Sequence, residues 1–260
     1  MTRDGYRSHP ALNYSSAKWL LESPADYKCR LDKPVEQTHA MLLGTLAHSV
    51  ILEGKTLLEI ASIKPVGLNL ATKEGKAWKA EQTLPIISAG DADDILGMAN
   101  GVMANPHARQ LLEGAQHREM PLLAKIKGVM CKGLIDAAGI IADESCDDGK
   151  NWAIIDLKTT ADPSPKEFRW SAIKNRYALQ AAWYRTLLAN VHGFEDDRPQ
   201  WYWIAVGKSA PWTAVVYTLP VEWEMAGEAD LERVLEAYNA CTASGQWPRP
   251  HQESILVLDP

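Results

Sequence analysis

The segment WAIIDLKTT, at residues 152–160, constrains the fold more than any other part of the sequence. It is short, apolar and bounded by residues that favour turns, which predicts a β-strand. Because side chains alternate along a strand, Asp156 and Lys158 share one face while Ile155 and Leu157 point to the other. An acid and a lysine at the end of an apolar strand indicate either a site or an ordinary ion pair of low energy.

The pattern around this strand predicts helices first, then strands and helices in alternation. Helices are predicted at 38–54, ending at Gly54, at 91–113 with an interruption near Pro106, at 165–190 with a break near Asn175, and at 221–243. Strands are predicted at 119–138 with a turn at Gly128, at 152–160, at 201–208 and at 212–219. This order predicts one α/β core with an N-terminal helical layer and no separate linker.

We therefore expect a single domain over residues 1–260. Its parts are a mainly helical region at 1–115, a sheet-containing catalytic core at 116–220, and a C-terminal helix and tail at 221–260.

The charge balance excludes a protein that coats nucleic acid through a polycationic surface. Lys and Arg number 27 against 33 Asp and Glu, a net charge of −6. Contact with nucleic acid would need a local basic groove, or metal ions that offset clustered carboxylates. No apolar run approaches the roughly 18 residues of a membrane-spanning helix. Without an apolar signal core or a Cys-x-x-Cys pair, we expect free thiols and a cytoplasmic location.

A second carboxylate strengthens the case for a site. Asp136 ends the segment KGLID, twenty residues before Asp156, and the two converge if their strands pair. Two close carboxylates repel each other, and a divalent cation relieves that repulsion. Oxygen ligands suit Mg²⁺ or Mn²⁺, which favour phosphoryl chemistry. Lys158 would then orient or deprotonate the attacking water, or neutralise charge in the transition state.

Two further segments carry polar side chains that could join this site. Tyr177, Gln180 and Tyr184 share one helix face, which could contact phosphate, although a packed helix with phenol tips in water fits equally. His48 lies in an apolar helix one turn after Gly44, a glycine that could allow close backbone approach. A lone histidine in such a helix is more often a core residue than a ligand.

In order along the chain, these motifs resemble the PD-(D/E)XK nuclease superfamily. They are Gly44-Thr45-x-x-His48, Gly133-x-x-Asp136, Asp156-x-Lys158-Thr159-Thr160 and Tyr177-x-x-Gln180-x-x-x-Tyr184. The sequence looks most like the RecE branch, exonuclease VIII and its phage relatives, from about residue 12 to about residue 190. The opening segment from Leu12 to Pro24 also resembles the start of that branch.

The resemblance implies a fold, a site and an activity. The fold is a central mixed β-sheet flanked by helices. The implied metal ligands are His48, Asp136, Asp156 and the backbone carbonyl of Leu157, with Lys158 as the catalytic lysine and Gln180 and Tyr184 completing the site. The cofactor is Mg²⁺ or Mn²⁺, and an imidazole ligand favours Mn²⁺.

The implied activity is digestion of linear double-stranded DNA from 5′ ends. Such an enzyme serves phage-type recombination in a bacterial host cell, is encoded by a phage or prophage, and feeds a single-strand annealing protein. The implied assembly is a ring-forming homo-oligomer, with no membrane partner. Two alternatives stay open: a structure-specific DNA endonuclease on the same fold, and a catalytically silent DNA-binding protein. The intact Asp136, Asp156 and Lys158 argue against the silent protein.

The sequence departs from the family in two places. The connection at 139–150 is longer and more acidic than expected, and we place it away from the DNA that it would repel. Its acids are Asp143, Glu144, Asp147 and Asp148. Only Cys241 follows the nuclease motifs, so we expect no iron–sulfur cluster.

A last prediction concerns the 5′ end of the DNA. Ser15 and Ser16 are expected to open a helix that Pro24 stops, with Lys18 in its first turn. Free backbone N–H groups and the helix dipole favour anions, so this terminus could hold a 5′-phosphate. The alternative is simple helix capping beside a solvated lysine.

Overall fold

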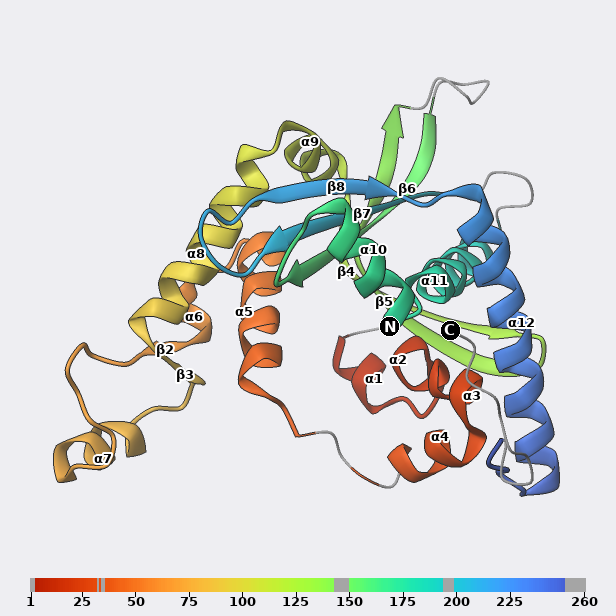
Figure 1. Ribbon diagram of the computed structural model, residues 1–260, viewed down its shortest axis with the longest axis horizontal. Coiled ribbons are helices and arrows are strands. Elements are labelled where there is room, and N and C mark those ends of the chain that lie inside the picture. The colour runs from red at the N-terminus through yellow and green to blue at the C-terminus, as the bar shows by residue number, and fades with distance from the viewer. Residues whose placement is uncertain (1–2, 32, 34–35, 143–149, 194–198, 251–260) are drawn as a thin grey trace.

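A mixed β-sheet lies at the centre of the molecule, with helices against both of its faces (Figure 1). The structure is a computed structural model that describes residues 3–31, 33, 36–142, 150–193 and 199–250. Its helices are α1 (Arg3–Ser8), α2 (Tyr14–Ala17), α3 (Trp19–Glu22), α4 (Pro24–Leu31), α5 (His39–Glu53), α6 (Leu57–Ile60), α7 (Lys73–Ala80), α8 (Ala89–Ala104), α9 (Pro106–Gly114), α10 (Pro165–Lys174), α11 (Tyr177–His192) and α12 (Val221–Ser244). Its strands are β1 (Leu12–Asn13), β2 (Ser62–Ile63), β3 (Ile86–Ile87), β4 (His117–Ile126), β5 (Val129–Ala142), β6 (Lys150–Thr160), β7 (Gln200–Gly207) and β8 (Ala214–Thr218).

The sheet confirms the predicted mixed architecture. Its strand order is β1-β5-β6-β7-β8, and β4 pairs with β5. β5 runs antiparallel to β4 and β6, and β8 antiparallel to β7, whereas the pairs β6–β7 and β1–β5 are parallel. The parallel pair β6–β7 needs a long crossover, which α10 and α11 supply. Residues 12–13, for which the sequence pattern predicted no strand, form β1 and join the sheet.

Two apolar cores lie on the two faces of the sheet. Ile154 packs with residues of α2, α3, α4, α11 and α12, whereas Ile155 and Leu157 pack with residues of α5, α8 and α9. This division confirms the side-chain alternation predicted for the central strand. The helical N-terminal part of the chain therefore contributes to both faces.

Local sequence signals place most element ends correctly. The side chain of Thr38 caps α5 at its start, and Gly54 ends it in the left-handed conformation. α8 and α9 meet at Asn105, and α10 ends before Asn175, close to both predicted breaks. Gly128 lies in the turn between β4 and β5, as predicted.

The connection between β5 and β6 differs from the prediction. β5 extends to Ala142 and β6 begins at Lys150, because residues on both sides of the connection continue the antiparallel ladder. The connection is therefore shorter than the predicted 139–150. Its acids Asp143, Glu144, Asp147 and Asp148 lie outside the described residues.

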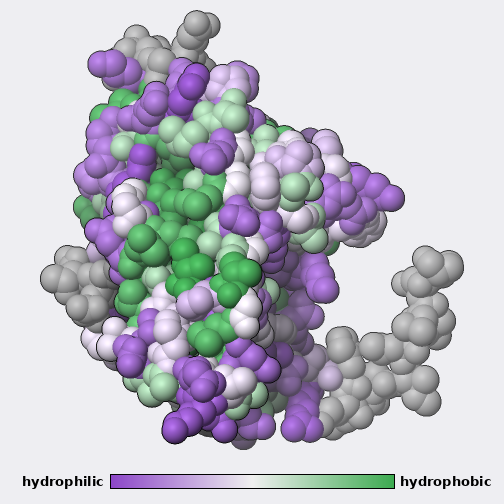
Figure 2. Space-filling model, turned by 90° about the vertical axis from the view of Figure 1, so that its left-hand side faces the viewer, coloured by the Kyte–Doolittle hydropathy of each residue, from purple (hydrophilic) through white to green (hydrophobic). Residues whose placement is uncertain are grey.

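One face of the molecule is apolar over a wide area. Figure 2 shows apolar side chains gathered on the side that lies at the left of Figure 1, where α6 and α8 run. Leu58 of α6 and Leu96 and Met103 of α8 are among the exposed large apolar residues. An apolar face of this kind is typical of a contact surface. None of the described helices is long and apolar enough to cross a membrane.

α8 holds the loop between β7 and β8 through two glycines. An added methyl group at Gly97 would lie 2.3 Å from the ring of Trp212, and one at Gly101 would lie 2.0 Å from its backbone oxygen. The indole N–H of Trp212 also donates to Asp94 Oδ1 at 3.0 Å. The helix and the loop can pack this closely only because both positions lack a side chain.

We predict that Gly101→Ala lowers the free energy of unfolding by about 1–3 kcal/mol, the usual cost of overpacking. Urea denaturation of the purified protein measures the change. Gly90→Ala in the same helix is the control, because its methyl group would meet only Ser88 Oγ at 3.8 Å. Equal stability of the two variants would contradict the packing argument.

Candidate functional site

Strand register places three carboxylates in a row across the sheet. The β4–β5 register is continuous on both sides of Glu119 and sets this residue opposite Asp136. The β5–β6 register ends at the pair Ala137–Ile155, directly before Asp136 and Asp156, whose carboxyl groups are close enough to interact electrostatically. Directly opposite side chains of antiparallel strands lie on the same face. The row therefore confirms the predicted approach of Asp136 and Asp156 and adds Glu119.

The row lies at an interruption in the sheet. β4 occupies one edge of β5, so β1 and β6 share the other, with β1 beside Cys131–Lys132 and β6 beside the residues from Ala137 onward. Asp136 lies between these two stretches. Its Oδ2 accepts a hydrogen bond from the backbone N–H of Leu157 at 2.8 Å. A side chain thus binds β6 where the backbone ladder has stopped.

The backbone is also irregular at this point. A methyl group on Gly133 would press on Tyr184 of α11, whereas one on Gly139 would press on the segment that follows α9. Residues six apart in a regular strand share a face, but Gly133 and Gly139 face different helices. The alternation of side chains along β5 therefore shifts once between these two residues. Opposite Asp136, Glu119 has a φ of +48°, which is uncommon outside glycine. Such outliers cluster at functional sites, where the surrounding structure maintains them.

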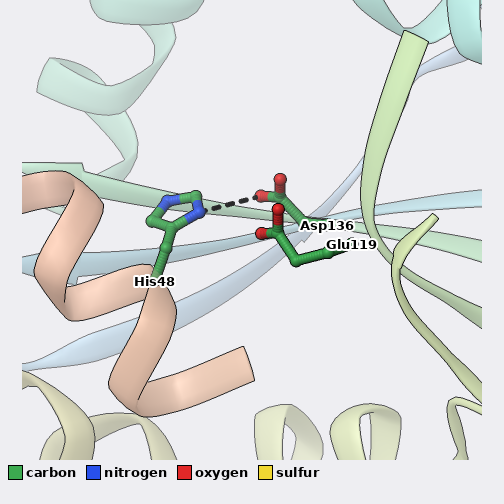
Figure 3. A group of neighbouring side chains, drawn as sticks. All are labelled: His48, Glu119 and Asp136. Carbon is green, nitrogen blue, oxygen red and sulfur yellow. Dashed lines mark ion pairs between the residues drawn. The ribbon is translucent and has the colours of Figure 1, made fainter. Parts of the chain in front are cut away.

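Three side chains form a group that could hold a metal ion. One ligand atom from each of His48, Glu119 and Asp136 lies within 4.8 Å of the others. Figure 3 shows His48 reaching from α5 toward the two carboxylates on the strands, and its Nδ1 lies 3.6 Å from Asp136 Oδ2. The backbone of Leu157 also hydrogen-bonds to the imidazole. One imidazole and two carboxylates suit a divalent ion such as Mn²⁺ or Mg²⁺.

Asp156 is held in a different way. Its Oδ2 lies 2.6 Å from Lys158 Nζ, and its Oδ1 accepts a hydrogen bond from Gln180 Nε2 at 2.7 Å. Its carboxylate is almost fully buried, with 2% of the residue exposed. The structure thus brings His48 and Asp136 together and holds Asp156 beside them on Lys158 and Gln180.

Glu119 is the site residue that the sequence analysis missed. It lies in a strand whose polar and apolar residues do not alternate cleanly, so nothing in its own segment singles it out. The sequence signal that could have identified Glu119 is its position in the β4–β5 hairpin. Glu119 and Asp136 each lie eight residues from the turn pair Lys127–Gly128, one on each strand. Counting outward from that turn would have set the two carboxylates opposite each other.

Burial controls the protonation of the site. It raises the pKa of Asp136 to about 6, although Lys158 and the Leu157 N–H oppose the shift. Burial also raises the pKa of Asp156 to about 6, which Lys158 opposes and Asp136 reinforces. The pKa of His48 is lowered by burial and then by Lys158, which leaves the imidazole neutral and able to bind a metal.

Lys158 keeps its charge. Burial disfavours the ammonium, but the lysine pKa is raised above its ordinary value by the electrostatic effect of Asp156, Tyr177 and Asp136. The ammonium also lies 4.8 Å from the centre of the Tyr177 ring. At neutral pH this side chain is a fixed positive charge beside the carboxylates.

The polar face of α11 points toward the site, which is one of the two arrangements that the sequence left open. Gln180 is buried against Asp156, and Tyr177 and Tyr184 are half-buried. Gly133 lets Tyr184 approach the sheet, because a Cβ there would lie 2.9 Å from a ring carbon. Gly44 has no such role. A methyl group on it would meet Thr159 Oγ1 at an ordinary 3.5 Å, so the close backbone approach that a glycine could allow here is not found.

The N-terminal helix begins at a different residue from the one predicted. Helix α2 begins at Tyr14, and Asn13 caps it by accepting a hydrogen bond from the Ser16 N–H at 3.0 Å. The prediction that Ser15 or Ser16 caps this helix is wrong, since the Asn13 side chain already occupies the free N–H group. Pro24 follows the end of α3 and begins α4.

Lys18 lies at the junction of α2 and α3, near Lys158 of the candidate site. Its Nζ lies 5.9 Å and 5.6 Å from the ring centres of Tyr14 and Trp19. Burial lowers its pKa, and the charge of Lys158 lowers it further. The 5′-phosphate pocket of Ser15, Ser16 and Lys18 stays a prediction.

Comparisons with known proteins agree with this architecture. Residues 13–255 match a family described as a PDDEXK-like domain of unknown function (DUF3799). A crystal structure from Eubacterium rectale, described as that of a candidate exonuclease, matches with a TM-score of 0.63 and 14% sequence identity. The match covers 100% of this chain and 95% of that one, and at this identity it shows the fold alone. No curated protein matches the sequence.

The raised pKa of Asp136 predicts a pH-dependent stability of the metal-free protein. A buried carboxyl with a raised pKa stabilises the fold while it is protonated, and that stability is lost as the pH rises through about 6. Asp136→Asn cannot ionise and keeps an oxygen for the Leu157 N–H. In EDTA at pH 7.5 we expect this variant to be more stable than wild type by about 1–3 kcal/mol, and equally stable at pH 4.

Urea unfolding at the two pH values measures this difference. The exposed Asp93→Asn is the control and should show no pH-dependent gain. With saturating Mn²⁺ we expect the wild type to be more stable than Asp136→Asn, because the wild type gains the free energy of metal binding and Asp136→Asn has lost a ligand. A wild type that stays the more stable in EDTA at pH 7.5 would contradict the electrostatic description.

Proposed function

Because the chain belongs to the PDDEXK-like family DUF3799, we propose that it is a metal-dependent deoxyribonuclease that hydrolyses phosphodiester bonds. The family assignment confirms the PD-(D/E)XK resemblance, whereas the RecE branch stays a prediction. The observation that carries the proposal is the row of Glu119, Asp136 and Asp156, flanked by His48 and Lys158. A structural or purely binding role does not need buried and half-buried acids gathered beside a lysine.

Each side chain of the site has a distinct task in this proposal. His48, Glu119 and Asp136 would hold the Mg²⁺ or Mn²⁺ ion, and the Leu157 N–H orients Asp136. When bound, the ion polarises the phosphate and lowers the pKa of water. The predicted ligands also include Asp156 and the Leu157 carbonyl, which lie beside this group.

Lys158 acts through its charge. Its raised pKa favours neutralisation of the phosphate in the transition state over proton abstraction from water. Asp156 holds the ammonium in place, and Gln180 holds Asp156 from the other side. Tyr184 hydrogen-bonds with Gln180 and lies near both Asp156 and Asp136.

The substrate and direction rest on the resemblance. We propose a 5′-to-3′ exonuclease that starts at ends of linear double-stranded DNA and serves phage-type recombination with a single-strand annealing protein. The structure from Eubacterium rectale is itself described as a candidate exonuclease, which supports this choice. A structure-specific endonuclease and a catalytically silent DNA-binding protein are the alternatives.

The larger organisation is proposed on the same basis. We propose that residues 1–260 form one nuclease domain that assembles into a ring in the cytoplasm of a bacterial host. Such an assembly could bury the apolar face over α6 and α8. Light scattering in solution measures the assembly directly.

Cleavage of two DNA forms separates the three activities. With Mn²⁺, the wild type should digest linear duplex and spare a closed circle, and EDTA should stop the reaction. Asp156→Ala should cleave neither form, because it leaves Lys158 without its partner. Opening of the circle by the wild type would indicate an endonuclease, and no cleavage of either form a silent protein. Near-normal digestion by Asp156→Ala would show that the site assignment is wrong.

A second pair of variants separates metal binding from charge neutralisation. Lys158→Ala should reduce the cleavage rate by about 10²–10⁴-fold while Mn²⁺ affinity, measured by calorimetry, stays near that of wild type. Glu119→Gln should instead weaken Mn²⁺ binding, since it removes a ligand. Lys125→Ala, an exposed lysine of β4, is the control for lost surface charge. Loss of Mn²⁺ binding in a folded Lys158→Ala variant would assign the lysine another role.

A further inference from the structure

A groove of about 440 Å³ lies beside the catalytic centre. The end of β6, the outer side of α10 and the start of α11 line it, together with Lys208 after β7. Tyr177 lines the groove and also lies 4.8 Å from the Lys158 ammonium, and Thr159 lines it directly after Lys158 in the chain. The groove therefore lies next to the lysine side of the site, with Tyr177 between them.

Trp170 places an indole in this groove. Its residue is 61% exposed, whereas Trp183, Trp201 and Trp203 are buried. α10 packs on the core through Phe168. Trp170 lies two residues further along the helix, so its side chain projects to the opposite side. Core packing therefore does not account for an aromatic residue at this position, and its ring is available to a ligand.

The groove combines this ring with cations and neutral hydrogen-bonding groups. Lys174 and Lys208 line it, and their ammonium groups pair with no acid among the described residues. Two acids also line it. Asp162 Oδ1 accepts the Ser164 N–H at 2.7 Å at the start of α10, and Glu167 lies 4.0 Å from Lys166. Both acids thus have local partners, which leaves the two lysines to meet an anion.

We propose that this groove binds a single-stranded segment of nucleic acid, with an unpaired base stacked on Trp170 and the backbone phosphates near Lys174 and Lys208. An aromatic platform beside cations is the usual means of holding a single strand without sequence preference. A base inside a duplex has both faces covered by its neighbours, so the indole can stack on an unpaired base but not on a base in the interior of a duplex. The inference rests on the proposed nuclease function, because it places the single strand directly beside the cleavage site.

Binding without cleavage tests the groove. The probe is a fluorescein-labelled twelve-nucleotide oligo-dT, titrated in EDTA at several salt concentrations and followed by anisotropy. We expect Trp170→Ala to weaken binding by about tenfold and Trp170→Phe to recover most of that loss. Ile173→Ala is the matched control, since this residue is 44% exposed on the same helix and does not line the groove.

The salt dependence separates stacking from charge. The double variant Lys174→Gln/Lys208→Gln should reduce the slope of log Kobs against log salt by about 1.4, because each phosphate contact on a single strand contributes about 0.7. Trp170→Ala should leave that slope unchanged. An unchanged affinity in Trp170→Ala, or an equal loss in Ile173→Ala, would overturn the stacking proposal.

Digestion of linear duplex with Mn²⁺, run in parallel, keeps the two proposals distinct. A wild type that cleaves while Trp170→Ala binds oligo-dT normally overturns the groove alone. If the wild type does not cleave, but the Trp170→Ala variant binds oligo-dT more weakly than the wild type, the nuclease proposal is overturned and the binding groove is supported.

Discussion

The rest of the site depends on the hydrogen bond from the Leu157 N–H to Asp136 Oδ2, which joins β6 to β5. It lies where β5 has left β1 and begins to pair with β6, so a carboxylate replaces the missing backbone acceptor. This interruption leaves room for side chains inside a sheet that is otherwise closed by helices on both faces. The site is thus a local break in regular pairing, and its chemistry depends on that break.

Buried charge is the second constraint. Burial raises the pKa of both Asp136 and Asp156, so the acids are costly to ionise unless positive charge lies beside them. Lys158, on the same strand as Asp156, supplies one positive charge. A divalent ion would supply the remaining positive charge. An overall net charge of −6 is therefore compatible with a substrate of phosphates, because the relevant charge is local.

The groove and the site share one structural origin. β6 carries Asp156 and Lys158 and then Thr159, and α11 carries Tyr177 into the groove and Gln180 into the site. One strand and one helix thus serve both regions. A strand of nucleic acid held in the groove would lie beside the charge of Lys158.

The sequence by itself determined most of the longer helices and strands, the face of the central strand and most residues of the candidate site. Alternation placed Asp156 with Lys158, and helical spacing placed Gln180 on the face that contacts Asp156. These features are local, because neighbouring residues in a strand or helix have fixed relative directions. Tertiary structure alone decided the membership of Glu119, the pairing of β1 with β5, and the capping of α2 by Asn13. Each depends on register or on packing between segments far apart in the chain, and local periodicity carries no information about which strand lies opposite which.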